Sequence, residues 1–473
     1  MSAALLIDFG STYTKLRAVD LDRARLIGTG QGPSTVATDI TVGLKAALQD
    51  LEQRIGELPA FRHRLASSSA AGGLRMVTVG LVRELTAEAA RQAALGAGAR
   101  LVGTFAYEIT SADTKKLTEL APDIILFAGG TDGGNRDVIV ANARTLAGSS
   151  LQCPIIVAGN RVAADDVQAI LDGAGKAVMV TENVMPEFGE LNIEPAREVI
   201  RQVFVDRIVQ SKGIDRAHEM FDQVLMPTPA AVLEGARLLA EGCRGHDGLG
   251  PLLVVDVGGA TTDIHSVCSG EPTQAGAVRR GLPEPHVKRT VEGDLGMRHN
   301  ATSILEAAGI EAIAADAGLS AARLATLVQR AHEEIEWLPQ SSEEHAVDHA
   351  LARAAVRLAV RRHAGTIETV YTVTGPVSVQ RGKDLGDVGS VIGTGGALAY
   401  STKPGEILAM ALADPKEPLS LRPANPRLLL DREYLLYACG LLAAVEPQAA
   451  LTLALQHIRP LGQEEQHGQS SIL

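Results

Sequence analysis

One pattern of residue types occurs twice in this sequence and limits the folds that the chain can adopt. LLIDFGSTYTKLRAV lies near the N-terminus, and LLVVDVGGATTDIHSV begins at residue 252 of the 473 residues. Each copy reads as an apolar strand, an aspartate, an apolar residue, a glycine, small or hydroxyl residues, and a second strand. Because glycine adopts positive φ without steric cost, each copy predicts a strand–turn–strand hairpin. A plain hairpin requires neither the hydroxyls nor a second aspartate, and the repetition predicts an internal duplication whose two halves face each other.

The polar residues of both turns are of the types that bind phosphate. Backbone N–H groups in a tight glycine turn point at anionic oxygens, and hydroxyl groups add further donors. The predicted nucleotide-binding residues of the two hairpins are Gly10, Ser11, Thr12, Lys15, Gly258, Gly259, Thr261 and Thr262. Lys15 is the least specific of these, because a lysine on the second strand of a hairpin either contacts phosphate or lies on a solvated face.

Three aspartates complete the predicted site. A carboxylate at a strand end can hold a hydrated Mg²⁺, which uses few protein ligands, and this makes Asp8 and Asp256 the predicted metal ligands. Asp263 can orient a water molecule or a metal ligand, as positioned carboxylates do in phosphoryl transfer. The sequence therefore predicts Asp8, Asp256 and Asp263 as catalytic residues, with ATP and Mg²⁺ as the cofactors.

A third glycine-rich strand end follows in VIGTGGALAY, residues 391–400. Its glycines, Gly393, Gly395 and Gly396, would let bare backbone approach a flat base. The order of hairpin, hairpin and Gly-Gly strand end resembles the phosphate-1, phosphate-2 and adenosine motifs of the actin, Hsp70 and sugar-kinase superfamily. Ala260 stands where the second Hsp70 hairpin has a third glycine. The resemblance implies an α/β fold with two actin-like (RNase H-like) lobes that face a nucleotide cleft.

The rest of the chain predicts how these lobes are divided. Strand and helix patterns alternate strictly from about residue 100, which predicts a Rossmann-like α/β insert at about 100–215 within the first lobe. The first lobe is expected at 1–245 and the second at 246–460, with a Gly-rich boundary between them, and 461–473 is a predicted disordered tail. Helices are expected at 39–55, with Thr38 or Asp39 as the cap, at 86–97, 194–210 and 229–241, and throughout 301–365.

Two further glycine-rich segments have two possible interpretations each. FAGGTDGGN, residues 127–135, is a ligand loop or simply a tight strand–helix connection. VEGDLGMRHN, residues 291–300, places Glu292 and Asp294 beside glycines, and a capped loop is the simpler interpretation.

Composition excludes several classes of protein. The net charge of −12 argues against a large nucleic-acid interface, which needs surplus lysine and arginine. The four cysteines are far apart without CxxC spacing, so neither a disulfide framework nor a zinc site is expected, and a reduced, cytoplasmic setting is the default. The N-terminus has the pattern of a first strand instead of a signal peptide, and no apolar stretch is long enough for a membrane span.

The chain as a whole resembles the accessory proteins of adenosylcobalamin-dependent glutamate (methylaspartate) mutase. This family is often called MutL or GlmL and is unrelated to the mismatch-repair protein that shares the first name. The resemblance lies in LLIDFGSTYTKLRAVD, DIILFAGGTDGGN, VVDVGGATTDIHSV, VEGDLGMRHNA, VIGTGGAL and LLLDREYLLYACGLLA, which are spread over most of residues 3–446. It implies an ATP-dependent, chaperone-like role in keeping a cobalamin mutase active, with the mutase subunits as partners. No cobalamin-binding DxHxxG occurs in the sequence, so the cofactor is expected on the partner.

Two other classes stay open from the residues alone. A small-molecule kinase would use the same phosphate clamp, together with an acceptor pocket and a catalytic base. An ATP-dependent hydantoinase or oxoprolinase has hairpins of the DxGGTxTD type that look much like DVGGATTD. Nucleotide turnover stimulated by a mutase favours the accessory role, whereas stimulation by a sugar, an acid or a hydantoin favours an enzyme. The sequence does not indicate the oligomeric state.

Overall fold

The computed structural model describes residues 2–10, 13–35, 39–68, 74–211, 220–373 and 375–461. The chain divides into two compact units, each of which is described by itself. The first unit comprises Met1–Glu234, Gly281–Pro285 and Gly440–Ala449, and the second comprises Gly235–Arg280, His286–Cys439 and Ala450–Leu473. The division falls within helix α7 (Thr228–Glu241), slightly before the predicted boundary at residues 245–246. The predicted tail lies, apart from Leu461, outside the described residues.

The first unit contains a five-stranded sheet in the order β10-β4-β1-β2-β3. Its strands are β1 (Ala3–Phe9), β2 (Tyr13–Asp20), β3 (Arg25–Pro33), β4 (Phe61–Ser68) and β10 (Gln223–Pro227). Strands β1, β2 and β3 form an antiparallel meander, whereas β4 runs parallel to β1 and β10 runs parallel to β4. This arrangement places the first predicted hairpin, β1–β2, in the middle of the sheet.

Helix α1 (Ile40–Ile55) packs directly on strand β3 of this sheet. It begins at Asp39, whose side chain accepts a hydrogen bond from the backbone N–H of Thr41. Alternate residues of β3 are glycines, and a Cβ at Gly30 would lie 2.3 Å from the carbonyl oxygen of Ala47. The absence of a side chain at these glycines of β3 therefore permits the close approach of the helix. The expected helix and its Asp39 cap are confirmed.

The second unit contains a sheet with the same core topology, in the order β14-β12-β11-β17-β18-β19. Its strands are β11 (Leu252–Val257), β12 (Thr262–Val267), β14 (Val287–Glu292), β17 (Ser390–Thr394), β18 (Arg427–Leu430) and β19 (Arg459–Pro460). Again three strands form an antiparallel meander, and two more run parallel to the first strand of the meander. The α/β class is confirmed, and the repeated topology agrees with the predicted duplication into actin-like lobes.

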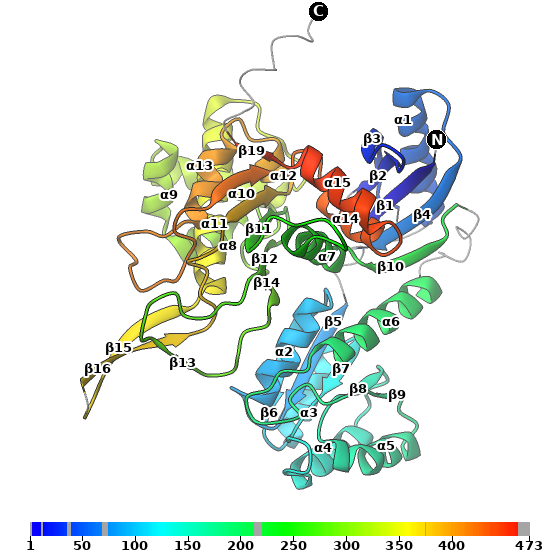
Figure 1. The fold of residues 1–473 in the computed structure, drawn as a ribbon, viewed down its shortest axis with the longest axis vertical. Helices are drawn as coiled ribbons and strands as arrows, with labels where there is room; N and C mark the ends of the chain where they lie inside the picture. The colour runs from blue at the N-terminus through cyan, green and yellow to red at the C-terminus, as the bar shows by residue number, and fades with distance from the viewer. Residues whose placement is uncertain are drawn as a thin grey trace, which may run out of the picture. The chain divides into compact units, whose positions relative to one another are not determined.

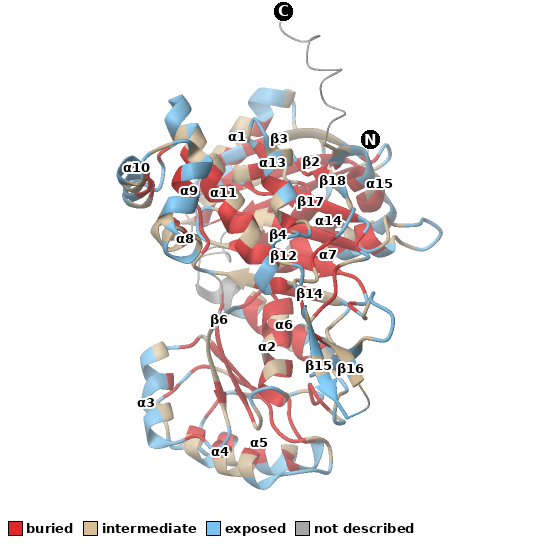
Figure 2. Ribbon diagram, turned by 90° about the vertical axis from the view of Figure 1, so that its left-hand side faces the viewer, coloured by how far each residue is buried: buried red, intermediate tan, exposed pale blue. Residues whose placement is uncertain are grey.

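The helices between residues 301 and 363 form a cluster, in which one helix packs on the second sheet and the others pack against that helix. They are α8 (Ala301–Ala308), α9 (Ile310–Ala317), α10 (Ala321–Glu333) and α11 (Ser342–His363), in agreement with the helices expected over 301–365. Helix α11 begins with a capping box between Ser341 and Glu344 and packs on β11 and β12. Figure 2 shows it largely buried, whereas α9 and α10 expose their outer faces. The shorter helices are α12 (Gly396–Ala399) and α13 (Pro404–Leu408), followed by α14 (Leu436–Ala443) and α15 (Pro447–His457).

The α/β insert of the first unit has a five-stranded parallel sheet in the order β6-β5-β7-β8-β9. Its strands are β5 (Arg75–Gly80), β6 (Arg100–Ala106), β7 (Ile124–Phe127), β8 (Ile155–Val157) and β9 (Val178–Val180) (Figure 1). Its helices are α2 (Thr86–Gly96), α3 (Ser111–Leu120), α4 (Asp137–Ala147), α5 (Ala164–Gly173) and α6 (Glu194–Ser211). The strand order is that of a doubly wound sheet. The insert begins at β5, earlier than the predicted residue 100. The sequence did not indicate this, because the pattern of a strand does not reveal which sheet the strand will join.

A third, small sheet, β13-β16-β15, lies in the second unit, and short 3₁₀ turns complete the chain. The strands are β13 (Val278–Arg280), β15 (Thr366–Thr372) and β16 (Gly375–Arg381), and the turns are Arg161–Ala163 and Ala409–Ala411.

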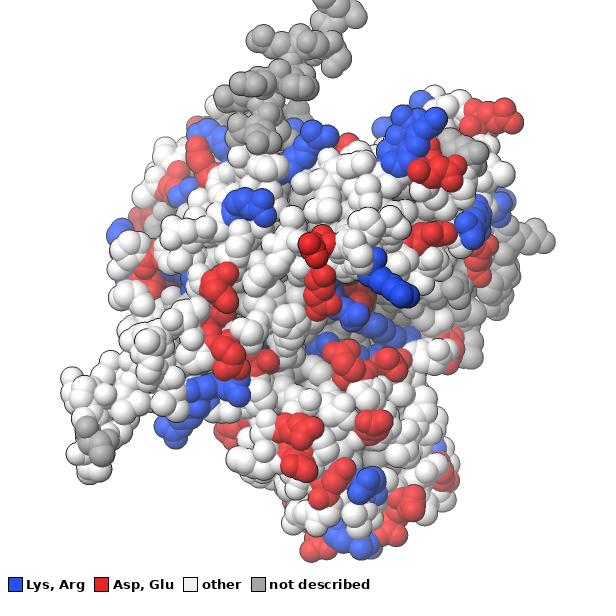
Figure 3. Space-filling model, in the orientation of Figure 1, with Lys and Arg blue, Asp and Glu red and all other residues white. Residues whose placement is uncertain are grey.

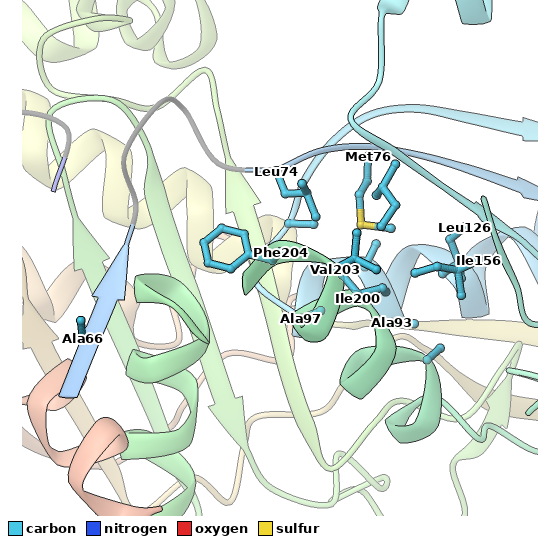
Figure 4. Close-up of a cluster of buried hydrophobic side chains, with 14 of the residues drawn as sticks. Ala66, Leu74, Met76, Ala93, Ala97, Leu126, Ile156, Ile200, Val203 and Phe204 are labelled. Atoms are coloured by element: carbon cyan, nitrogen blue, oxygen red, sulfur yellow. The ribbon is translucent and has the colours of Figure 1, made fainter. Parts of the chain in front are cut away.

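The first unit is held by a core in which small side chains are prominent. Figure 4 shows Met76, Leu126 and Ile156 beside Ile200 and Val203 of α6. Alanines such as Ala93 of α2 and Ala97, directly after that helix, complete the cluster, which is consistent with a chain that has only 3% aromatic residues. Burial of this apolar surface stabilises the unit by about 25 cal/mol per Å².

Two surface properties bear on function. On the face shown in Figure 3, lysine and arginine side chains are interspersed with aspartate and glutamate. Among the described residues, no helix combines the length and the apolar character that crossing a membrane requires.

Candidate functional site

The first glycine turn is closed by a backbone hydrogen bond from the Gly10 N–H to the Tyr13 carbonyl oxygen, at 3.0 Å. A Cβ at Gly10 would lie 2.6 Å from the same oxygen, so a larger residue would disturb the turn. The hydroxyl of Ser34 donates to the Gly10 carbonyl at 2.7 Å. Ser11 and Thr12, two of the predicted phosphate-binding residues, lie outside the described residues.

Asp8 is buried beside this turn, with 2% of its surface exposed. It pairs with Lys15 in the β1–β2 register, and the hydroxyl of Thr228 donates to its carboxylate at 2.6 Å. Burial raises the pKa of Asp8, while the charge of Lys15 and the hydrogen bond from Thr228 act in the opposite direction. A buried carboxylate that is only partly compensated is a site where a bound cation would be stabilising.

The second glycine turn is closed in the same way as the first. The Gly258 N–H donates to the Thr261 carbonyl at 2.9 Å, which is the counterpart of the Gly10–Tyr13 bond. The two turns therefore share the backbone hydrogen bond that closes them as well as their sequence pattern. This correspondence supports the proposal that both turns serve one kind of ligand.

Segment 297–300 holds the carbonyl side of the second turn. The carbonyl of Gly258 accepts from the Met297 N–H, and that of Gly259 accepts from the N–H groups of Arg298 and His299. The side-chain amide of Asn300 donates to Ala260 and also to Gly293. Just before this segment, a Cβ at Gly296 would lie 2.3 Å from the carbonyl group of Ala260, so only glycine allows this packing.

The fixed carbonyls determine where the N–H groups of the turn point. In a planar trans peptide the N–H is directed opposite to the C=O of the same unit, and no described peptide is cis. The N–H groups of Gly259, Ala260 and Thr261 are therefore directed away from segment 297–300. Those of Gly259 and Ala260, both exposed residues, make no hydrogen bond within the described part of the chain. Successive N–H groups with this orientation form an anion-binding concavity.

The third glycine motif lies directly beside the second hairpin. Strand β17 runs parallel to β11, with Thr394 paired to Asp256. Gly395 follows with φ 88°, and a Cβ there would lie 2.5 Å from the Asp256 carboxylate. Gly396 begins α12, and a Cβ there would make only an ordinary contact with the Tyr400 ring, whereas Gly393 packs against Leu398. The structure thus brings Asp256, Gly395 and Gly396 together at one edge of the sheet.

Two predicted residues of the second hairpin have their polar atoms engaged by the protein. The buried hydroxyl of Thr262 donates to the Leu295 carbonyl at 2.7 Å, which does not support its predicted contact with phosphate. Asp263 is 8% exposed; Arg289 donates twice to one of its oxygens, and the Thr261 hydroxyl donates to the other at 2.7 Å. This geometry favours a bracing role for Asp263, although its predicted role in orienting water stays a prediction.

Sequence reasoning missed several residues that shape the site. Thr228 and Arg289 are distant in sequence from the carboxylates that they contact, and no local pattern indicates them. Segment 297–300 belongs to the stretch 291–300, which is interpreted above as a capped loop. Gly296 and Asn300 of that stretch are the residues that could have indicated its contact with the second turn. Within that stretch, Glu292 and Asp294 both bind Arg362, so they form an ion-pair cluster.

The glycine-rich loop of the insert is held by two buried asparagines. Asn160 donates to the carbonyls of Gly134 and Asn135 and accepts from the N–H of Gly133. Asn183 donates to the Gly130 carbonyl and to the Asp132 carboxylate. These bonds favour the interpretation of 127–135 as a tight connection.

Each unit contains a carboxylate of the kind that fits Mg²⁺ bound together with a nucleotide. No group of three or more histidine, cysteine, aspartate or glutamate side chains that could hold a metal occurs among the described residues. Mg²⁺ bound together with phosphates needs only one or two carboxylates, because water and phosphate supply its other ligands. The buried carboxylate of Asp8, and that of Asp256 against bare backbone at Gly395, are of this kind.

Comparisons with known proteins give one strong match. A family model described as MutL protein matches residues 4–458. Protein MutL of Clostridium tetanomorphum is 47% identical over 459 residues, covering 97% of this chain and 99% of the relative.

Solved structures are only weakly similar to the whole chain. A xylulose kinase from Bifidobacterium adolescentis aligns over 97% of this chain and 94% of its own, with 11% identity and a TM-score of 0.31. A glycerol dehydratase reactivase aligns over 93% and 99%, with 11% identity and a TM-score of 0.35. Scores this low support no conclusion about function.

Proposed function

The chain belongs to the MutL family, and from that premise we propose that it is an ATP-dependent accessory protein that reactivates an adenosylcobalamin-dependent mutase of the glutamate mutase type. The family membership is the reason for proposing a mutase as the partner, and the paired glycine turns are the reason for proposing that the chain binds a nucleotide. The protein would act as a slow ATPase that serves a partner and has no metabolic substrate of its own.

One observation carries the nucleotide part of the proposal. The same hairpin, with an aspartate before a glycine turn that is closed by the same backbone bond, occurs on two sheets of the same topology. Unpaired N–H groups at the second turn suit phosphate oxygens, and bare backbone at Gly395 and Gly396 suits a base. A chain that had duplicated only for stability would not need anion-binding backbone in its turns.

Asp8 and Asp256 would hold Mg²⁺ in this proposal. The bound ion would neutralise phosphate charge, and the chain's own groups would orient the nucleotide. Gly259 and Ala260 would donate backbone N–H groups to phosphate, and Lys15 would add a positive charge near Asp8. Asp263 would keep the Thr261 hydroxyl oriented at the edge of the turn.

A nucleotide-driven switch is the second part of the proposal. A switch acts on a partner only if its ATP and ADP states differ in affinity for that partner, and the partner then shifts nucleotide affinity by the same factor. In the proposed cycle one state, reached by the predicted closure of the lobes, binds the mutase and loosens its cobalamin site, and the other releases it. The α/β insert is the surface that we propose contacts the mutase, because in this proposal the hairpins are occupied by the nucleotide.

Reactivation of a turnover-inactivated mutase tests the proposal. The assay combines the inactivated enzyme, this protein, Mg·ATP and fresh adenosylcobalamin, and activity should return only when all are present. Asp8→Ala and Asp256→Ala should abolish recovery. Glu311→Ala, which removes an exposed carboxylate from α9, is the matched control and should recover activity as the wild type does.

The results separate the two parts of the proposal. If calorimetry detects no binding of Mg·ATP at millimolar concentration, the nucleotide assignment is wrong. If the protein binds Mg·ATP but restores no cobalamin mutase from its own source and forms no complex with one in either nucleotide state, the accessory role is wrong. Turnover stimulated by a small acceptor molecule would then indicate a kinase.

A further inference from the structure

Arg298 joins the second glycine turn to helices α10 and α11. Its backbone N–H donates to the Gly259 carbonyl at 2.9 Å. Its guanidinium forms a two-pronged ion pair with Asp348 of α11, at 3.0 and 2.7 Å. Bidentate pairs of this kind fix orientation as well as contributing energy. One residue thus connects the support of the turn with the longest helix of the second unit.

The side chain of Arg298 is held on further sides. Its guanidinium donates to the carbonyls of Met297, at 2.9 Å, and of Trp337, at 3.3 Å. It also lies over the Trp337 ring, 5.4 Å from the centroid, and Arg330 lies over the same ring at 5.2 Å. Only 12% of the Arg298 side chain is exposed, so these contacts are largely shielded from water. The result is a rigid joint between segment 297–300, α10 and α11.

The turn depends on this joint because its other side is free. The carbonyls of Gly258 and Gly259 are bound by segment 297–300, whereas the N–H groups of Gly259 and Ala260 have no partner within the described part of the chain. Glycine-rich backbone is intrinsically flexible, and a rotation of either peptide would turn an N–H away from its ligand. The anchoring of segment 297–300 therefore determines the direction of the anion-binding N–H groups.

We propose that Arg298 is a positioning residue for phosphate binding, which acts through its ion pair with Asp348 and its contact with Trp337 to keep the N–H groups of the second turn directed at the nucleotide. The inference rests on the proposed nucleotide-binding function. It adds a specific requirement, since phosphate recognition would depend on Arg298 and Asp348, whose charged groups are paired with each other. Trp337 is the only tryptophan of the chain, so its fluorescence reports directly on this joint.

Calorimetry on Arg298→Lys and Asp348→Asn tests the inference. Both changes break the bidentate pair, and each should weaken Mg·ATP binding about 10-fold while leaving adenosine binding unchanged, because adenosine has no phosphate. The double variant should be no worse than either single variant, as expected for two residues that act as one unit. Asp316→Asn is the matched control, since it breaks the pair of Asp316 with Arg353 of the same helix α11 and should leave both affinities unchanged.

Trp337 fluorescence provides a readout that a purely structural role would not move. Mg·ATP should change the emission of the wild type and of Asp316→Asn. The change should be absent in Arg298→Lys at nucleotide concentrations that saturate it, because the link between the turn and the ring is broken. Circular dichroism confirms that each variant is folded, and if Arg298→Lys does not fold, Asp348→Asn, which keeps the size of the side chain, decides the result.

The outcomes distinguish this inference from the proposed function. If the wild type binds Mg·ATP and both folded variants bind it equally well, the positioning role is refuted while the proposed function stands. Equal loss of ATP and adenosine binding would also refute it, because that result indicates a general structural defect. If the wild type binds no Mg·ATP, the proposed function and the inference fall together.

Discussion

Replacement by alanine should affect stability differently at the two adjacent glycines of the third motif, Gly395 and Gly396. Gly395 has φ 88° and ψ 160°, a region that is almost restricted to glycine, and a side chain there costs about 1–3 kcal/mol of strain. Its Cβ would also lie 2.5 Å from both the Asp256 carboxylate and the Val257 carbonyl, and relieving such overpacking costs about 1–3 kcal/mol more. Gly395→Ala should therefore destabilise the protein by about 2–6 kcal/mol.

Gly396 is the matched control for this prediction. The nearest atom to its Cβ would be a ring carbon of Tyr400 at 3.9 Å, and the residue begins α12. Alanine is favoured over glycine in a helix by about 0.5–1 kcal/mol, so Gly396→Ala should be neutral or slightly stabilising.

Urea unfolding measures both stabilities, and calorimetry measures Mg·ATP affinity. Because the only relief available to an alanine at 395 is to move Asp256 or the Val257 backbone, Gly395→Ala should also weaken Mg·ATP binding. Equal stability of the two variants would refute the argument from close approach, and so would a larger loss for Gly396→Ala.

Three other changes follow from buried polar groups. Burial raises the pKa of Asp8, so the stability that this carboxyl group contributes is lost as the pH rises from the ordinary pKa of 3.8 through the raised pKa. Asp8→Asn should therefore raise Tm at pH 7, by about 2–4 °C for each kcal/mol of stability gained, and it should also remove metal-dependent ATP binding. Differential scanning fluorimetry with and without Mg·ATP measures both effects. Burial lowers the pKa of His265 to about 3, and both of its ring nitrogens lack a partner among the described residues. Between pH 6.5 and pH 5 the free energy of unfolding of the wild type should therefore fall by about 2 kcal/mol relative to that of His265→Leu, as measured by urea unfolding. Parallel pH profiles of the two proteins would contradict this prediction. Asn160→Ala removes four hydrogen bonds at a buried position and should lower the free energy of unfolding by about 2–4 kcal/mol. Hydrogen exchange at residues 129–136 should become faster, while the affinity for Mg·ATP should not change. Slow exchange at these residues in the variant would show that Asn160 does not hold the loop.

The two hairpins could be predicted from sequence because their determinants are local. Alternating apolar residues, an aspartate and a glycine turn lie within a short segment, and the structure forms β1–β2 and β11–β12 as expected. The Asp39 cap of α1 is equally local. Such features depend on intrinsic backbone preferences, which a single sequence displays directly.

The surroundings of the aspartates could not be predicted, because they depend on strand pairing and on distant residues. Thr228 contacts Asp8 across 220 positions of sequence. Arg289 reaches Asp263 because β14 pairs with β12 in one particular register, which places Arg289 opposite His265. An alternating pattern predicts the existence and the faces of a strand, but leaves its neighbour undetermined. The same reason explains why β5 was assigned to the lobe when it belongs to the insert.

The described parts of the two hairpins favour different roles for them. In the second turn, three backbone N–H groups and the Asn300 amide hold the carbonyls of Gly258, Gly259 and Ala260. In the first turn, the Gly10 carbonyl accepts from the Ser34 hydroxyl, and the two residues after Gly10 lie outside the described residues. Asp8 is buried against Thr228, while Asp256 is less buried and lies against Gly395. A turn held on several carbonyls keeps its N–H groups pre-oriented, so it suits recognition of phosphate. A buried carboxylate whose pKa is raised by burial, such as Asp8, would be stabilised by a bound cation, so it suits a response to the metal. We therefore expect the second turn to contribute to phosphate affinity, and Asp8 to contribute to the dependence on Mg²⁺.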